Sequence, residues 1–226
     1  MAANIISGKI VKGIGGFYYI DAEDGVLYEC KAKGIFRNKK IKPLVGDNVN
    51  IEILDAENNL GNIVEILPRF NSLIRPAVAN VDQTIIIFAV SEPEPNFNLL
   101  DRFLVSMEKS GVKTVICFNK LDLSAENMDV CRSYGKSGYR TLFISAKNDE
   151  GIDELKEIIR DKTTVFAGPS GVGKSSTLNA IKPDAEAQTG AVSDKIKRGK
   201  HTTRHSELMH ISGNTYIMDT PGFSSL

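Results

Sequence analysis

The chain has 226 residues, 42% of them hydrophobic, and its 28 basic side chains balance its 28 acidic ones. This length allows one large domain and a small one, and the apolar content is enough for a packed core. The N-terminus lacks the apolar stretch of a secretion signal, and no apolar run is long enough to cross a bilayer. We therefore expect a cytoplasmic protein with no membrane partner.

The cysteines exclude one further class of protein. Cys30, Cys117 and Cys131 are odd in number, lie far apart and show no CxxC spacing. Neither a disulfide framework nor a zinc site is implied, and we expect three reduced thiols.

The first third of the chain has the pattern of short β-strands. We expect strands over 16–20, 26–30, 48–54 and 62–67, separated by turn residues such as Asp24-Gly25. About five short strands in such a stretch favour a small all-β barrel of the OB-fold kind. The glycine cluster at 13–16 lacks the spacing of a dinucleotide-binding loop and runs into a strand, so we interpret it as a β-bend.

From residue 79 the pattern changes to alternating strands and helices. Near-continuous apolar strands are expected over 82–90, 114–118, 141–144 and 164–167, and helices over 99–110 and 153–160. This alternation predicts an α/β doubly wound sheet, which binds ligands at the carboxyl ends of its strands. The predicted domains are an OB-fold barrel over 1–68, a proline-bracketed linker over 69–76 and an α/β domain over 77–226.

A complete phosphate-binding loop follows the strand over 164–167. Residues 168–175 read GPSGVGKS, which matches GxxxxGK[ST], and a helix is expected next. The glycines let backbone N–H groups wrap phosphates, while the helix directs its positive end at them. We expect Lys174 to reach the β- and γ-phosphates and Ser175 to bind Mg²⁺. The predicted phosphate-binding residues of this loop are Gly168, Pro169, Ser170, Gly171, Val172, Gly173, Lys174, Ser175 and Ser176.

Two further motifs indicate guanine as the base. Asn119-Lys120-Leu121-Asp122 follows the strand over 114–118, and Ser145-Ala146-Lys147 follows the strand over 141–144. The Asp122 carboxylate can accept hydrogen bonds from guanine N1–H and the 2-amino group, whereas adenine would leave it unpaired. Lys120 can lay its stem along the base, Asn119 can tie loops together, and a backbone N–H of the second motif can donate to guanine O6.

The last motif, Asp219-Thr-Pro-Gly222, predicts the side of the site that faces the metal and the γ-phosphate. We expect Asp219 to hold Mg²⁺ through water and the Gly222 N–H to contact the γ-phosphate. Thr202 and Thr203 lie in a polar segment before it, and one of them is expected to supply a hydroxyl to Mg²⁺. The sequence leaves open which threonine does so.

The order of these motifs carries a resemblance to a known family. Ras-like GTPases run phosphate loop, switch threonine, DxxG, NKxD and SAK, whereas here NKxD and SAK come first. With the N-terminal β-region, the linker and the segment 199–204, which reads GKHTTR, the chain resembles the circularly permuted, ribosome-small-subunit-dependent GTPase A family of bacteria. The resemblance covers essentially the whole chain.

The resemblance implies an N-terminal OB-fold and a GTPase domain that hydrolyses GTP to GDP. It implies activity stimulated by the 30S subunit during late maturation, with 16S rRNA as a partner. It also implies a zinc-binding domain with Cys and His ligands, and since the sequence ends at Leu226, we expect that zinc site to be absent from this chain.

The catalytic residues suggested by the sequence are His201 and Lys174. Ras-like enzymes use a glutamine after DxxG to orient water, but the residue here is Phe223, which cannot do so. His201, beside the threonines, could position or accept a proton from water, and the family resemblance supports it. The alternative is an exposed histidine with no catalytic role.

One basic stretch of the barrel region suits contact with an RNA backbone, and OB barrels commonly bind RNA through loops. A solvated basic loop is the alternative, and the family resemblance favours ribosomal RNA. The residues of this stretch are Lys31, Lys33, Arg37, Lys39, Lys40 and Lys42.

The leading function is therefore a monomeric GTPase that acts as a checkpoint in ribosome assembly. A module that holds nucleotide and RNA but barely turns over is the second hypothesis, suggested by Phe223. An ATP-dependent small-molecule kinase shares only the phosphate loop, and Asn119 and Asp122 argue against it.

Overall fold

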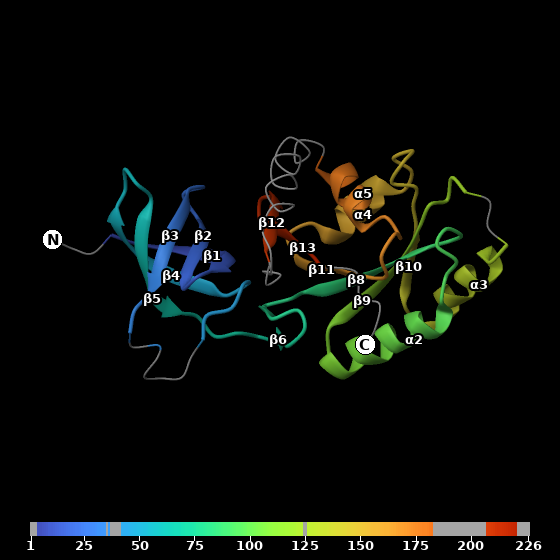
Figure 1. The fold of residues 1–226 in the computed structure, drawn as a ribbon, viewed down its shortest axis with the longest axis horizontal. Helices are drawn as coiled ribbons and strands as arrows, with labels where there is room; N and C mark the ends of the chain where they lie inside the picture. Colours follow the sequence, from blue (N-terminus) through green and yellow to red (C-terminus); the bar gives the residue numbers. More distant parts are fainter. Residues whose placement is uncertain (1–3, 35, 37–41, 124–125, 183–206, 221–226) are drawn as a thin grey trace. The chain divides into compact units, whose positions relative to one another are not determined.

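The computed structural model describes residues 4–34, 36, 42–123, 126–182 and 207–220 (Figure 1). The described residues form two compact units. One holds residues up to 81 together with 207–210, and the other holds residues from 82 together with 211–220. The predicted boundaries at 68/69 and 76/77 stay predictions.

The first unit is built on a closed five-stranded barrel, which confirms the predicted small all-β fold. Its strands follow the order β1-β2-β3-β5-β4, and only the β3–β5 pair is parallel. The core contains Ile10, Ile20, Ile51 and Ile63, all fully buried. The strands are β1 (Ile5–Ile14), β2 (Phe17–Ala22), β3 (Leu27–Ala32), β4 (Asn48–Asp55) and β5 (Leu60–Ile66).

The strand β1 was absent from the sequence-based prediction. It contains Gly8, a residue that ordinarily weakens a strand. Here a Cβ at Gly8 would lie 2.7 Å from the Asp21 carbonyl oxygen, so the missing side chain allows β1 and β2 to approach closely. The predicted bend is confirmed, because Gly15 and Gly16 take φ values of 59° and 88° in the turn between these strands.

A buried ion pair fixes the chain where the barrel ends. The Asp47 side chain is fully buried, and its two oxygens accept from Arg69 Nε at 2.6 Å and Nη2 at 2.8 Å. Asp47 also accepts from the Leu44 N–H at 2.7 Å, while Arg69 donates to the Lys42 carbonyl at 2.8 Å. The hydrogen bond that Arg69 donates to Asp47 raises the pKa of Arg69. The segment after β5 is thereby held to the turn before β4. Beyond Arg69 the short strands β6 (Ser72–Leu73) and β7 (Val78–Ala79) pair with each other.

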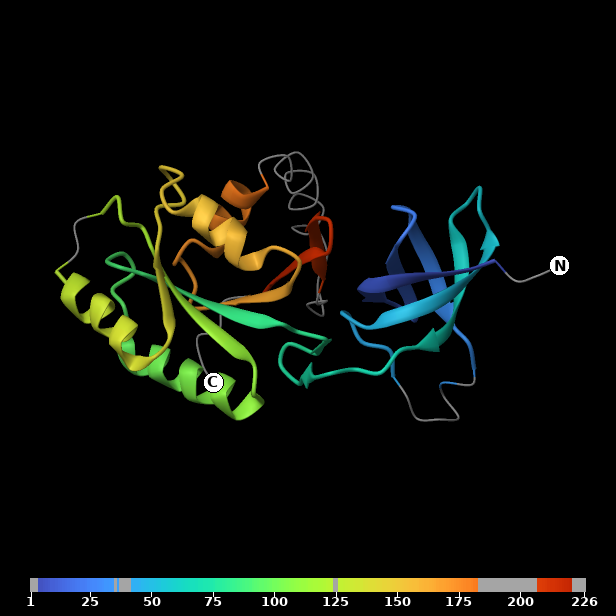
Figure 2. The same ribbon diagram turned by 180° about the vertical axis from the view of Figure 1, so that it is seen from behind.

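The second unit is an α/β layer structure, as predicted. Its six-stranded sheet has the order β10-β9-β8-β11-β13-β12, and the pairs from β10 through β13 are all parallel. Helices α2 and α3 cover one face of the sheet, and α4 and α5 cover the other (Figures 1 and 2). The strands are β8 (Gln83–Ala89), β9 (Lys113–Asn119), β10 (Arg140–Phe143), β11 (Thr163–Ala167), β12 (Leu208–Ser212) and β13 (Thr215–Asp219). The strand β12 belongs to this sheet, although the division into units falls within it, after residue 210.

Capping residues define both ends of α2, the longest of the described helices. The Asn96 side chain caps α2 by accepting from the Leu99 N–H at 3.0 Å, and Gly111 ends that helix with φ of 65°. The sequence did not predict α3, whose six residues are too few to show a helical period. The helices are α2 (Phe97–Ser110), α3 (Met128–Ser133), α4 (Ile152–Ile159) and α5 (Lys174–Ile181), with a 3₁₀ turn at Tyr134–Ser137.

The three cysteines are buried and unpaired. Burial raises the pKa of Cys30 and Cys131 to about 11 and that of Cys117 to about 12, so all three thiols are protonated at neutral pH. Within the described ranges, no helix is long and apolar enough to cross a membrane.

The ion pair between Asp47 and Arg69 leads to a stability prediction. We expect Arg69→Met to lower the free energy of unfolding of the barrel unit by about 3 kcal/mol, because it leaves a buried carboxylate without its cation. Urea unfolding followed by circular dichroism measures this change. Arg75→Met, which removes an exposed arginine of the same unit, is the matched control. Equal loss in the two variants would show that the pair contributes no specific stability.

Candidate functional site

The predicted nucleotide motifs meet at one edge of the parallel sheet. Asn119 ends β9, Ser145 follows β10, Gly168 follows β11 and Asp219 ends β13. Because these strands are parallel, their carboxyl ends lie at the same edge. The motifs therefore converge there although they are scattered along the chain.

The Asn119 side chain joins three of these loops. Asn119 is 2% exposed, and its amide Nδ2 donates to the Val172 carbonyl of the phosphate loop at 3.0 Å. Its Oδ1 accepts from the Lys120 N–H at 2.7 Å and from the Ala146 N–H at 3.1 Å. One buried amide thus sets the spacing between the phosphate loop and both base-side motifs.

At two positions of the phosphate loop, both the backbone angle and the lack of room for a side chain require glycine. Gly173 has φ of 93°, and a Cβ there would lie 2.3 Å from Asn119 Nδ2. Gly168 has φ of 142°, and a Cβ there would lie 2.1 Å from the Ile87 carbonyl oxygen of β8. Any side chain at these positions would push the loop away from the sheet.

Lys174 opens α5 and turns its side chain back over the loop. The residue is 8% exposed, and its ammonium donates to the carbonyls of Gly168 at 2.9 Å and Pro169 at 2.7 Å. Burial lowers the pKa of Lys174, whereas the negative charge of Asp219 raises it. The cation is therefore held inside the loop that the sequence assigns to phosphate.

Asp219 and Ser175 provide oxygen atoms of the kind that Mg²⁺ prefers. Desolvation raises the pKa of Asp219, while the charge of Lys174 lowers it. The backbone after Asp219 is anchored by Thr220, whose hydroxyl donates to the Phe166 carbonyl at 2.7 Å. Ser175 is exposed in the first turn of α5. A carboxylate at the end of β13 and a hydroxyl in the first turn of α5 are ligand types that a divalent cation binds. The other predicted residues here, His201, Thr202, Thr203 and Gly222, lie outside the described residues.

The neighbours of the Asp122 carboxylate favour its charged form, which accepts hydrogen bonds. Its side chain is 11% exposed, and Oδ1 accepts from the hydroxyl of the fully buried Ser145 at 2.8 Å. The ammonium of Lys147 lies 3.6 Å from Oδ2. The hydrogen bond from Ser145, and more weakly the charge of Lys147, lowers the pKa of Asp122. The group is thus ionised at neutral pH and can accept from donors on a base.

Lys120 connects the site to a segment that the sequence analysis missed. Its φ is 68°, and its ammonium donates to the Glu92 carbonyl. The next residue, Pro93, lies beside the phosphate loop, since a Cβ at Gly171 would be 3.7 Å from its ring. The segment after β8 therefore belongs to the site. Its position at the carboxyl end of a buried parallel strand was the available signal.

The predicted RNA-binding lysines are only partly described. Lys31 and Lys33 are exposed, but each has a neighbour in the barrel: the Lys31 ammonium lies 5.0 Å from the Phe17 ring centroid, and Lys33 pairs with Glu52 at 2.7 Å. Lys42 is exposed before β4. Arg37, Lys39 and Lys40 lie outside the described residues, so the basic cluster stays a prediction.

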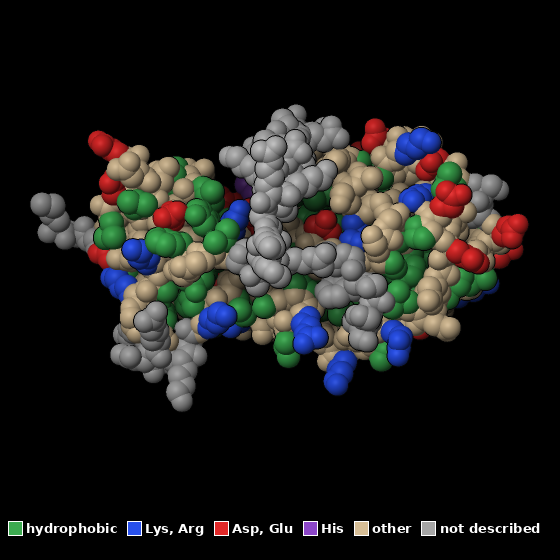
Figure 3. All heavy atoms as spheres, viewed as in Figure 1, with side chains coloured by type: hydrophobic (Ala, Val, Ile, Leu, Met, Phe, Trp, Pro, Cys, Tyr) green, Lys and Arg blue, Asp and Glu red, His purple; other side chains and the backbone are tan. Residues whose placement is uncertain are grey.

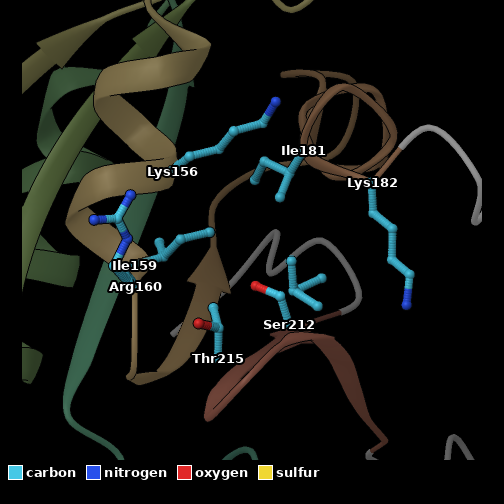
Figure 4. A pocket seen from close by; sticks show the side chains of 8 residues that line it. Lys156, Ile159, Arg160, Ile181, Lys182, Ser212 and Thr215 are labelled. Atoms are coloured by element: carbon cyan, nitrogen blue, oxygen red, sulfur yellow. The ribbon is translucent and has the colours of Figure 1, made fainter.

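A separate hollow of about 430 Å³ lies at the opposite edge of the sheet, beside the start of β13. Figure 4 shows its walls, formed by the ends of α4 and α5 and by the β12–β13 hairpin. Lys156, Arg160 and Lys182 point in different directions around it (Figure 4). These cations do not converge on one anion, and the hollow contains none of the predicted nucleotide-binding residues. Across the described parts of the chain, no group of three or more His, Cys, Asp or Glu side chains is placed to hold a metal ion.

Comparison with known proteins gives a clear family assignment. The model of the RsgA GTPase matches residues 66–226, and the model of the RsgA N-terminal domain matches residues 7–63. The chain belongs to the RsgA GTPase family. The circularly permuted family suggested by the motif order is thereby confirmed, and so is its assignment as an enzyme that hydrolyses GTP.

Individual relatives agree with this assignment. The small ribosomal subunit biogenesis GTPase RsgA of Agathobacter rectalis is 55% identical, over 98% of this chain and 77% of the relative. The protein of the same name from Alkaliphilus metalliredigens is 51% identical, over 97% of this chain and 75% of its own length.

Solved structures support the fold directly. YjeQ from Thermotoga maritima has a TM-score of 0.80 and 36% identity, covering 97% of this chain and 75% of that one. YloQ, described as a circularly permuted GTPase, has a TM-score of 0.75 and 40% identity, covering 99% of this chain and 73% of that one.

The contacts of Asn119 lead to a second prediction. We expect Asn119→Ala to weaken GDP binding about 100-fold, because three hydrogen bonds of about 1 kcal/mol each hold the loops together. Titration with a fluorescent GDP analogue measures the dissociation constant. Asn148→Ala, at an exposed asparagine after the Ser145 motif, is the control and should bind normally. Wild-type affinity in Asn119→Ala would mean that the loops do not depend on this side chain.

Proposed function

We propose that the chain is a GTPase that acts in biogenesis of the small ribosomal subunit, the process for which its relatives are named. The observation that carries the proposal is the joining of the phosphate loop to both base-side motifs by the buried Asn119 side chain. The ligands are GTP and GDP, and the partner is the small subunit.

Guanine recognition follows from the hydrogen-bond donors and acceptors of the base-side loops. Asp122 accepts from guanine N1–H and the 2-amino group, and Lys120 lays its stem along the base. In the Ser145 motif the Ser145 N–H donates to the Glu150 carbonyl at 3.0 Å and the Ala146 N–H donates to Asn119. Because these two N–H groups already have acceptors within the protein, the Lys147 N–H is the favoured donor to guanine O6.

The phosphate loop and its neighbours act on the transferred group. Lys174 neutralises charge on the β- and γ-phosphates, and the Gly222 N–H contacts the γ-phosphate. Ser175, Asp219 and one of Thr202 and Thr203 would hold Mg²⁺, which supplies charge neutralisation between the phosphates. With Phe223 in the glutamine position, His201 is the side chain that orients the attacking water.

We further propose that binding to the small subunit stimulates hydrolysis, at a late stage of its maturation. The barrel contacts 16S rRNA through the basic stretch from Lys31 to Lys42, and the monomeric chain works in the cytoplasm. The zinc site implied by the family stays outside this proposal.

The guanine assignment is tested by exchanging the acceptor. We expect Asp122→Asn to weaken GTP binding and to strengthen binding of xanthosine triphosphate, because the amide offers one donor and one acceptor in place of two acceptors. Competition binding with both nucleotides measures the preference. Asp129→Asn changes a carboxylate that is 99% exposed and serves as the control. An unchanged preference would remove Asp122 from the base site.

The enzymatic proposal is tested by phosphate release from GTP with and without purified small subunits. We expect stimulated turnover in the unchanged chain and a loss of about 100-fold or more in His201→Ala, the range for a positioned acid–base group. Its GTP affinity should stay nearly unchanged, because the imidazole acts on water. His205→Ala is the control. Absence of stimulation in the unchanged chain would contradict the ribosomal role, and full stimulated turnover in His201→Ala would exclude this histidine.

A further inference from the structure

One end of the barrel exposes large apolar side chains. Ile5 is 53% exposed, Leu27 is 52%, Leu54 is 61% and Leu60 is 39%. We call these four residues the apolar end of the barrel. Isolated exposed leucines are ordinary on protein surfaces, whereas a group of them usually marks a contact surface.

The strand pairing places the four residues together. Leu60 begins β5 and pairs with Asp55 at the end of β4, and Leu27 lies two residues before Glu29, which pairs with Leu60 on its other side. Ile5 begins β1, which runs antiparallel to β4 and pairs there with Glu52. All four side chains therefore lie at the same end of the closed barrel.

Leu54 is exposed by a distortion of its strand. The pairing of β4 with β5 shifts register between Ile53 and Asp55, so Leu54 has no opposite residue. A bulge of this kind redirects a side chain, and here it presents the most exposed leucine of the group to solvent.

Acidic residues lie in two turns beside the apolar end. The turn before Leu27 carries Glu23 and Asp24, and the turn between Leu54 and Leu60 carries Asp55 and Glu57. Neither turn contains a lysine or arginine. In the space-filling view, hydrophobic side chains lie exposed over the barrel, with both acidic and basic side chains among them (Figure 3).

We propose that the apolar end docks a protein component of the small ribosomal subunit whose surface has an apolar centre and a rim of lysine and arginine side chains. This inference rests on the proposed function. Charge complementarity selects this partner: the acidic turns would repel RNA phosphates, and the aliphatic side chains offer no platform for stacking bases. A second copy of the chain would bring two sets of acidic turns together.

Two of the acidic side chains also have structural roles and are unsuitable for a test. Asp24 accepts from the Tyr28 hydroxyl at 2.9 Å and the Val26 N–H at 3.0 Å. Asp55 accepts from the N–H groups of Glu57 and Asn58, each at 3.0 Å. Glu23 and Glu57 are exposed and can be changed with less effect on the fold.

The first experiment measures binding of the full chain to purified small subunits. We expect the double variant Leu27→Thr, Leu54→Thr to bind about tenfold more weakly or worse, because it removes apolar surface that the contact would bury. Threonine keeps strand propensity, and an unchanged melting temperature checks the fold. Ile74→Thr, at a residue that is 89% exposed elsewhere in the same unit, should bind normally. Normal binding by the double variant would overturn the inference.

The second experiment separates a protein partner from RNA by the sign of the change. The double variant Glu23→Gln, Glu57→Gln should bind small subunits more weakly at low salt if its partner is basic protein, and more tightly if the acidic turns face RNA. Replacing Leu54 with a photoreactive benzoylphenylalanine should give crosslinks to protein within the small subunit. Crosslinks to rRNA or to a second copy would overturn the inference. If the unchanged chain does not bind small subunits at all, the proposed function itself fails.

Discussion

The Asn119 amide is the interaction on which the proposed nucleotide site depends. Its donor and acceptor are both used inside the protein, on three backbone groups from loops that are far apart in sequence. Such a buried group stabilises only when every partner is in place, and an unmade bond carries the full desolvation cost. The phosphate loop and the base-side motifs are therefore positioned as one assembly.

The permuted motif order follows naturally from this arrangement. What the site requires is that the carboxyl ends of β9, β10, β11 and β13 lie at one edge, and the parallel sheet provides this whatever the order of its strands along the chain. The close approaches at Gly168 and Gly173 are likewise contacts between strands and loops in space. A chain that joins the same strands in another order can therefore build the same site.

The sequence predicted which motifs meet at the sheet better than the contacts between them. The phosphate loop, Asn119 and Asp122 could be proposed as site residues because their motifs carry fixed spacing directly after apolar strands. The contact of Lys120 with Glu92 and the pairing of Lys33 with Glu52 could not, because each joins residues whose closeness is set only by tertiary structure. The second pairing shows that an acidic residue distant in sequence can lie beside a lysine of a basic stretch.

The missed fold elements have similar causes. The strand β1 contains glycine and lysine where a strand pattern asks for apolar residues, and its stability comes from close pairing with β2 and β4. The hairpin strand β12 is a short edge strand with half-exposed residues, so its sequence shows little periodicity. Both strands are specified by their neighbours in the sheet more than by their own composition.

The central claim is that three joined loops select guanine through the Asp122 carboxylate, and nucleotide selectivity tests it most directly. Affinities of the unchanged chain for GDP, inosine diphosphate and ADP can be compared by calorimetric titration. The account predicts that inosine diphosphate, which lacks the 2-amino group, binds about tenfold more weakly than GDP, and that ADP binds about 10³-fold more weakly or worse. Binding of ADP within tenfold of GDP would contradict it.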